Sequence, residues 1–150
     1  MGVLKTERNS GKTSALAQFT QGIDVDRRLA AQEVQVQSAW AKALGQIGVL
    51  SSAEAELVLK ALKEALALMD VGAFDWRVED EDVHMNLERF VTEKHGALGK
   101  KMHVGRSRND LIATTLRLFS AEACDEMSKQ VREMIAALAA QARAQAEVLV

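Results

Sequence analysis

The 150-residue sequence contains no proline and no tyrosine, and its only aromatic residues are two Trp and four Phe. Average proline usage of about 5% would give roughly seven in a chain of this length. All-β domains depend on turn-forming residues and on strands rich in aromatic and β-branched side chains. We therefore predict an all-α fold class.

The sequence also has a single cysteine, a small net charge and no long apolar run. Cys124 is the single cysteine, so it cannot form an internal disulfide, and this fits a reducing compartment. The 19 Lys and Arg against 21 Asp and Glu leave a formal charge of −2, which gives the whole molecule no attraction for nucleic acid. No apolar run approaches the roughly 20 residues that span a bilayer. We expect a cytoplasmic protein with neither a nucleic-acid nor a membrane partner.

Apolar residues recur at helical spacing in three N-terminal segments. The first predicted helix begins near Asp24 or Asp26 and loosens at Gly45. The second begins at Ser51, where Glu54 completes a capping-box pattern, and it ends at Gly72. The third begins at the acidic run 80–82, whose charges suit a helix N-terminus, and it ends at Gly96. We expect the first two helices to form an antiparallel pair.

The remaining N-terminal segments lack this periodicity. Residues 1–18 are expected to be extended or mobile. Residues 73–79 are expected to be a connection that Phe74 and Trp76 anchor to the core. Residues 96–108, which contain three glycines, are expected to be a loop.

From residue 106 to residue 150 the sequence contains neither Gly nor Pro. We predict one helix of about 40 residues, which begins with Asn109 or Asp110 as its cap. It is apolar on more than one side, so more than one side must be covered, either by additional chain or by other subunits. Because the sequence stops within an apolar stretch, we expect a fragment or a chain that folds with partners. The predicted domains are 1–108, an N-terminal helical domain, and 109–150, the start of a central long-helix domain.

One charged cluster lies within the predicted loop and another lies upstream of it. Lys100, Lys101, His103, Arg106 and Arg108 precede the long helix, and the acidic run 79–82 lies upstream. Arginine side chains and the free N–H groups of a helix N-terminus both bind carboxylates. The basic cluster is therefore a candidate anion site, and a solvated basic loop is the alternative on charge alone.

His84 and Glu88 lie four residues apart on the third predicted helix, so both could face a metal ion. A third ligand at suitable spacing is not evident, and the only cysteine is far away in sequence. We expect a surface pair or a hydrogen-bonded histidine, with no metal and no cofactor.

The segment His103-Val104-Gly105-Arg106-Ser107-Arg108-Asn109-Asp110 resembles the signature of argininosuccinate lyases in the fumarase/aspartase superfamily. The upstream segment 80–88, Asp-Glu-Asp-Val-His-Met-Asn-Leu-Glu, is similar to that family's acidic motif. Residues 19–29 resemble its entry to the first helix. The similarity extends from about residue 18 to the end of the chain.

The resemblance implies a homotetramer whose long helices form a central bundle, with each active site built from three chains. The implied reaction is the elimination of fumarate from argininosuccinate to give arginine, a step of arginine biosynthesis. By similarity, Arg108 and Asn109 contact the carboxylates of this dicarboxylate substrate with Ser107 nearby, and Asp82 and His84 help to order the site.

Some positions depart from the family pattern. The superfamily's catalytic serine lies in a Gly-Ser-Ser loop and its assisting histidine in a Thr-His segment, and neither motif occurs in residues 1–150. The catalytic residues are therefore unknown, and we expect no turnover from this chain alone. A Gly-Ser pair whose serine touches substrate in the family is replaced by Val36-Gln37. A sister lyase acting on another N-substituted succinate, a non-catalytic helical assembly protein and a helical module that binds an acidic partner all stay open.

Overall fold

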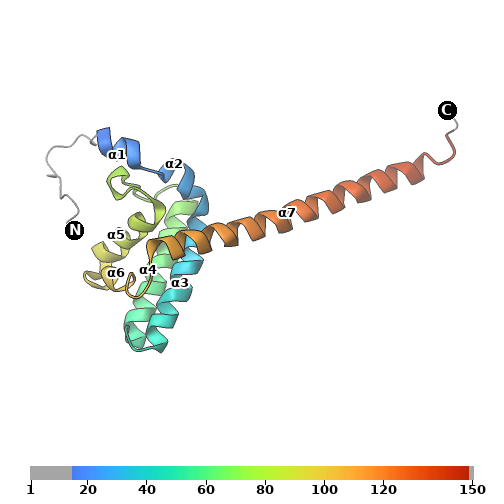
Figure 1. Cartoon of the computed structure of the whole chain (residues 1–150). Helices are drawn as coiled ribbons and strands as arrows, with labels where there is room; N and C mark the ends of the chain where they lie inside the picture. The colour runs from blue at the N-terminus through green and yellow to red at the C-terminus, as the bar shows by residue number, and fades with distance from the viewer. Residues whose placement is uncertain (1–14, 149–150) are drawn as a thin grey trace. The chain divides into compact units, whose positions relative to one another are not determined.

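The computed structural model describes residues 15–148, and these residues contain helices and connections but no strand. The all-α prediction is confirmed. The chain divides into two compact units, Met1–Gly105 and Arg106–Val150. Figure 1 shows the helices of both units.

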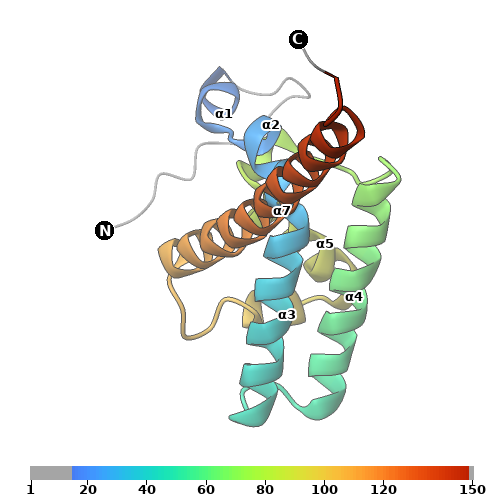
Figure 2. The same cartoon turned by 90° about the vertical axis from the view of Figure 1, so that its right-hand side faces the viewer.

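The core of the first unit is built on an antiparallel pair of helices, α3 (Ala30–Gln46) and α4 (Ser52–Asp70), which lie side by side in Figure 2. Ser51 caps α4 as the sequence predicts: its hydroxyl accepts from the Glu54 amide at 3.2 Å, and the Glu54 carboxylate accepts from the Ser51 amide at 2.8 Å. The apolar faces of the two helices meet at fully buried leucine, valine and alanine side chains, among them Leu44, Val58 and Leu62.

The start of the described chain is more helical than the sequence indicates. Helix α1 (Ala15–Thr20) occupies part of the segment that we expected to be extended, and residues 1–14 lie outside the described residues. Helix α2 (Ile23–Asp26) and a 3-10 turn, η1 (Arg27–Leu29), lead directly into α3. Asp24 lies inside α2, which already begins at Ile23 after Gly22, and Asp26 is at the N-cap position of η1 without a side-chain hydrogen bond to that cap.

Helix α5 (Val83–His95) follows the 3-10 turn η2 (Val78–Asp80) and packs on α4 and α6. Phe74 in the preceding connection is buried against Trp76 and Phe90, with ring centroids 4.7 and 5.4 Å away, which confirms the predicted anchor. The predicted loop 96–108 contains a short helix, α6 (Leu98–Lys101). Its pattern was too short to show a period, and burial of Leu98 holds it in place.

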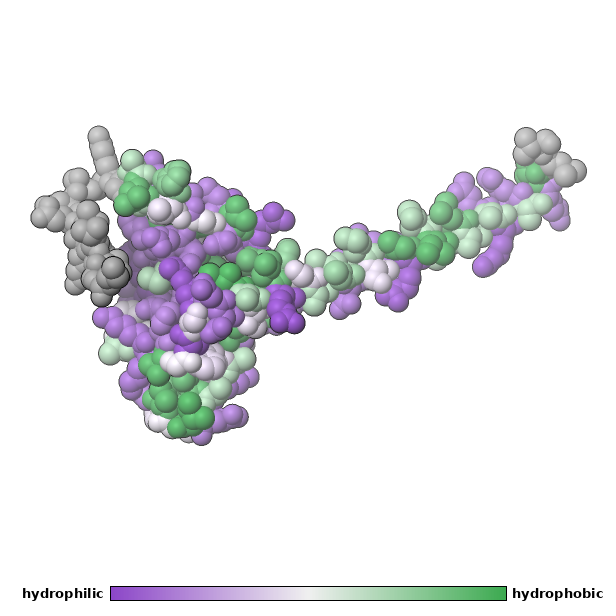
Figure 3. Space-filling view, viewed as in Figure 1, coloured by the Kyte–Doolittle hydropathy of each residue, from purple (hydrophilic) through white to green (hydrophobic). Residues whose placement is uncertain are grey.

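The second unit is dominated by α7 (Arg108–Ala144), one helix of 37 residues (Figure 1). Figure 3 shows apolar side chains interspersed with polar ones along it, and the exposed large residues include Met127, Val131, Met134, Ile135 and Leu138. The helix begins at Arg108 with Ser107 as N-cap, so the expected caps Asn109 and Asp110 are wrong. A serine that is followed three residues later by aspartate can bond the helix end reciprocally, which neither expected cap alone can do.

Candidate functional site

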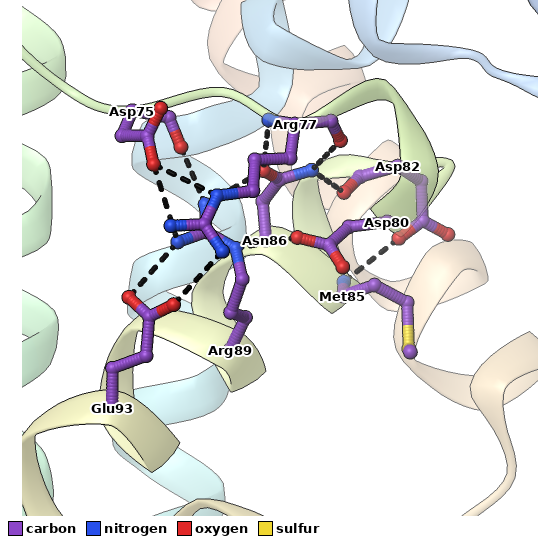
Figure 4. Close-up of polar contacts among 8 residues, drawn as sticks. All are labelled: Asp75, Arg77, Asp80, Asp82, Met85, Asn86, Arg89 and Glu93. Atoms are coloured by element: carbon purple, nitrogen blue, oxygen red, sulfur yellow. Dashed lines mark hydrogen bonds and ion pairs between the residues drawn. The ribbon is translucent and has the colours of Figure 1, made fainter. Parts of the chain in front are cut away.

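The segment that precedes α5 is tied to that helix by an ion-pair network, which includes Asp80 of η2 (Figure 4). Arg89 lies at its centre: its Nε donates to Asp80 Oδ2 at 2.5 Å, its Nη1 lies 3.1 Å from Glu93 Oε2, and its Nη2 donates to the Asp75 carbonyl. Arg77 bridges Asp75 at 2.9 Å and Glu93 at 3.0 Å. Asp80 thus binds an arginine of its own chain, and part of the acidic patch has a structural role.

Asn86 fixes the backbone of the same segment. Its side chain is completely buried, accepts from the Arg77 amide at 2.8 Å, and donates to the carbonyls of Arg77 and Asp82 at 3.2 and 2.9 Å. One buried side-chain amide therefore satisfies the Arg77 N–H group and adds a second donor to two carbonyls that also accept from the Asp80 and Asn86 amides. This arrangement sets where the chain enters α5.

Asp82, a predicted substrate-site residue, is the N-cap of α5. Its carboxylate accepts from the Met85 amide at 2.8 Å, as the acidic run predicts. Glu81 directly before it has φ +65°, and the Asp82 amide donates to the Asp80 carbonyl at 2.7 Å, which closes a tight three-residue turn. Such a turn is strained for a residue with a side chain. The strain shows that the position of Asp82 is imposed by the surrounding network.

His84, the second predicted site residue in this unit, lies in the first turn of α5 and is 2% exposed. Its Nδ1 lies 2.6 Å from Gln37 Nε2 and 3.4 Å from Glu33 Oε1, both on α3. Gln37 Nε2 also donates to Glu33 Oε1 at 3.0 Å. The predicted hydrogen-bonded histidine is therefore correct, and the predicted surface pair is not.

The other ring nitrogen of His84 faces a second histidine. His84 Nε2 lies 3.4 Å from His103 Nδ1 and 3.9 Å from Glu88 Oε2, and the last two atoms are 3.7 Å apart. His103, which follows α6, is the third potential ligand that the sequence did not reveal. It lies 19 residues from His84 along the chain, and only the packing of α6 on α5 brings the two together.

The basic cluster does not act as one group within the described structure. Lys101 Nζ lies 2.6 Å from Glu54 Oε1, and this lysine together with the Ser51 cap lowers the pKa of the Glu54 carboxyl from 4.5 to about 2. His103 belongs to the group around His84. Two of the five basic residues are therefore engaged inside the first unit.

The remaining predicted residues begin the second unit. Ser107 Oγ accepts from the Asn109 amide at 3.0 Å, and Asp110 Oδ2 accepts from the Ser107 amide at 3.1 Å. This cap places Arg108 and Asn109 in the first turn of α7, where the helix dipole favours an anion. The Ser107 hydroxyl is occupied by the cap.

The profile of the lyase family matches residues 7–150. The chain therefore belongs to this family of lyases. It is 42% identical to an argininosuccinate lyase of Azotobacter vinelandii over 134 residues. These aligned residues make up 89% of this chain and 29% of that enzyme. It is 39% identical to the argininosuccinate lyase of Pseudomonas aeruginosa strain LESB58, with the same coverage. A third such enzyme, from Chromohalobacter salexigens, is 44% identical over 119 residues, or 79% of this chain and 26% of the enzyme.

The chain spans less than a third of the length of these curated relatives. None of the helices in residues 15–148 combines the length and the apolar character needed to cross a bilayer.

Proposed function

We propose that this chain carries part of the substrate-binding machinery of a lyase that releases fumarate from argininosuccinate to give arginine. The observation that carries the proposal is the first turn of α7: the Ser107 cap presents Arg108 and Asn109 at the positive end of the dipole of a 37-residue helix. This is a fitting environment for a carboxylate. The similarity to argininosuccinate lyases supplies the substrate class.

In this proposal Arg108 and Asn109 bind substrate carboxylates, and Ser107 acts by capping the helix that presents them. His84 offers a polar group to the substrate, and Asp82 orders the start of α5 that carries it. Both are held by contacts within their own unit. The acid–base residues are not assigned to this chain.

We also propose that the enzyme is a homotetramer and is cytoplasmic. Large apolar side chains stay exposed along α7, and a helix of this kind is stabilised when other helices cover it. The single free cysteine fits a reducing compartment.

A chimera tests the function: this chain replaces the corresponding N-terminal part of the Azotobacter vinelandii enzyme, and fumarate release is followed by ultraviolet absorbance. We expect activity that Arg108→Ala lowers at least about 30-fold, because truncating one member of a buried charged pair costs at least about 2 kcal/mol. Lys63→Ala, at an exposed position on α4, is the matched control and keeps activity. A folded chimera whose activity is the same with Arg108→Ala as with Lys63→Ala contradicts the proposed role of Arg108.

A sister lyase acting on another N-substituted succinate is the second candidate. Gln37, which stands where the resemblance implies a substrate-touching serine, is buried and bonds Glu33 and His84 instead. A changed pocket wall permits a changed substituent on the succinate nitrogen. Comparing kcat/KM of the chimera for argininosuccinate and for other N-substituted succinates separates the two, because the sister lyase favours one of the latter.

A further inference from the structure

Three buried polar side chains form a chain of contacts between α3 and α5. Glu33 and Gln37 lie one helical turn apart on α3, and His84 lies opposite on α5. The three residues are between 1% and 2% exposed. Groups buried to this degree need well-matched donors and acceptors, so their arrangement restricts where the protons are.

The Glu33 carboxylate sets the orientation of the Gln37 amide. An ionised carboxylate only accepts hydrogen bonds, so the Gln37 atom 3.0 Å from Glu33 Oε1 must be the NH2 nitrogen. The same nitrogen lies 2.6 Å from His84 Nδ1. It brings its second hydrogen to that ring atom and lies nearer to it than Glu33 Oε1, which is 3.4 Å away, so Nδ1 is the acceptor and carries no proton. A neutral imidazole with a bare Nδ1 has its proton on Nε2.

We propose that Glu33 and Gln37 are positioning residues that hold His84 as its Nε2–H tautomer and thereby make it a neutral hydrogen-bond donor. The Nε2–H group points toward Glu88 and His103, on the side of the ring opposite α3. There it can donate to an oxygen of an anionic substrate. Only the identity of that acceptor rests on the proposed function, whereas the tautomer is a property of this chain.

The same contacts decide what the group formed by His84, Glu88 and His103 can bind. Its three candidate ligand atoms lie within 4.8 Å of one another, a spacing compatible with Zn²⁺. A metal ion needs the lone pair of His84 Nε2, and the proposed tautomer covers that atom with a proton. Moving the proton to Nδ1 would set it against the Gln37 amide. The group is therefore a hydrogen-bonding site. Exchanging the Glu33 carboxylate and the Gln37 amide should convert it into a metal site.

An exchange of the two α3 residues tests this directly. The double variant Glu33→Gln with Gln37→Glu keeps composition and side-chain volume but moves the carboxylate from residue 33, 3.4 Å from Nδ1, to residue 37, whose side chain lies 2.6 Å from Nδ1. The measurement is the 15N spectrum of the histidine rings, without substrate, at a pH of about 8 where an ordinary imidazole is neutral. We expect Nε2–H for His84 in the wild type and Nδ1–H in the double variant. Gln35→Glu, at an exposed position of the same helix, is the matched control and keeps the wild-type spectrum.

Zn²⁺ titration followed by calorimetry gives the second readout. The wild type should show no site that depends on His84, and the double variant should gain one site that His103→Ala removes. An Nδ1–H signal in the wild type, an unchanged tautomer in the folded double variant, or a His84-dependent zinc site in the wild type overturns the proposal. If the double variant does not fold, Gln37→Met removes the amide donor alone. That variant should then show a mixture of tautomers, and retention of pure Nε2–H contradicts the proposal.

These results do not depend on turnover. An inactive chimera with His84 as Nε2–H refutes the proposed function alone, and an active chimera with His84 as Nδ1–H refutes the positioning role alone.

Discussion

Gly99 allows α6 to lie directly against α5, and this contact brings His103 to His84. A Cβ atom built on Gly99 lies 2.1 Å from Thr92 Oγ1, 2.7 Å from the Thr92 amide nitrogen and 2.9 Å from the Glu88 carbonyl oxygen. The hydroxyl can rotate away, but the two backbone atoms belong to the middle of α5. Gly99→Ala therefore requires the two helices to separate.

The cost of Gly99→Ala follows from the overlap. To reach an ordinary contact of 3.4 Å from the Thr92 nitrogen, α6 must retreat by about 0.7 Å, which loosens the contacts of buried Leu98 and Met102. Overpacking of this kind costs about 1–3 kcal/mol. A gain of about 1 kcal/mol in helix propensity offsets part of it. We expect the free energy of unfolding to fall by up to about 2 kcal/mol.

Chemical denaturation of the 150-residue chain measures this change, with Gly45→Ala as the matched control. Gly45 lies in α3, and its added Cβ meets the Cβ of Ala55 at 3.3 Å and no backbone atom. This control should be neutral or stabilising by up to about 1 kcal/mol, because helix propensity then outweighs a slightly tight contact. Equal effects of the two substitutions would refute the claim that Gly99 is required for the approach of α6 to α5.

Three further outcomes follow from the contacts described above. Asn86→Leu should lower the free energy of unfolding by about 3 kcal/mol in a denaturant titration, since it removes the hydrogen bonds of a buried side chain and leaves the Arg77 amide without its acceptor; a loss under about 1 kcal/mol contradicts this. The folded-state pKa of Glu54 is lowered, so its stabilising effect is complete above pH 4.5 and is lost as the pH falls through about 2. Acid titrations should therefore show Glu54→Gln to be less stable than the wild type at neutral pH, with the difference shrinking as the pH falls to and below about 2, and a constant difference between the two would count against the ion pair. In the chimera, Arg108→Lys should raise KM roughly tenfold by losing bidentate contact, whereas an unchanged KM argues for a simple point charge.

Local sequence signals predicted much of the fold correctly. Ser51 and Glu54 gave the start of α4, the acidic run gave the start of α5, and the absence of Gly and Pro gave the long helix α7. These features depend on residues within one or two turns of each other. The short helix α6 escaped prediction because a few residues show no period, and its position depends on packing with α5.

The candidate site was only partly visible in the sequence. Asp82 and His84 were found through a resemblance, and the structure adds Glu33, Gln37 and His103 around the histidine. Gln37 lies 47 residues from His84, so no local pattern could connect them. Ser107 was identified as a site residue, but its role as the cap of α7 depends on a reciprocal bond with Asp110.

The central claim is that the first turn of α7 binds a carboxylate of the substrate, and equilibrium binding of succinate to the chimera by calorimetry tests it most directly. We predict saturable binding that Arg108→Ala abolishes and Lys63→Ala leaves intact. Succinate affinity that is the same in both variants would contradict the claim.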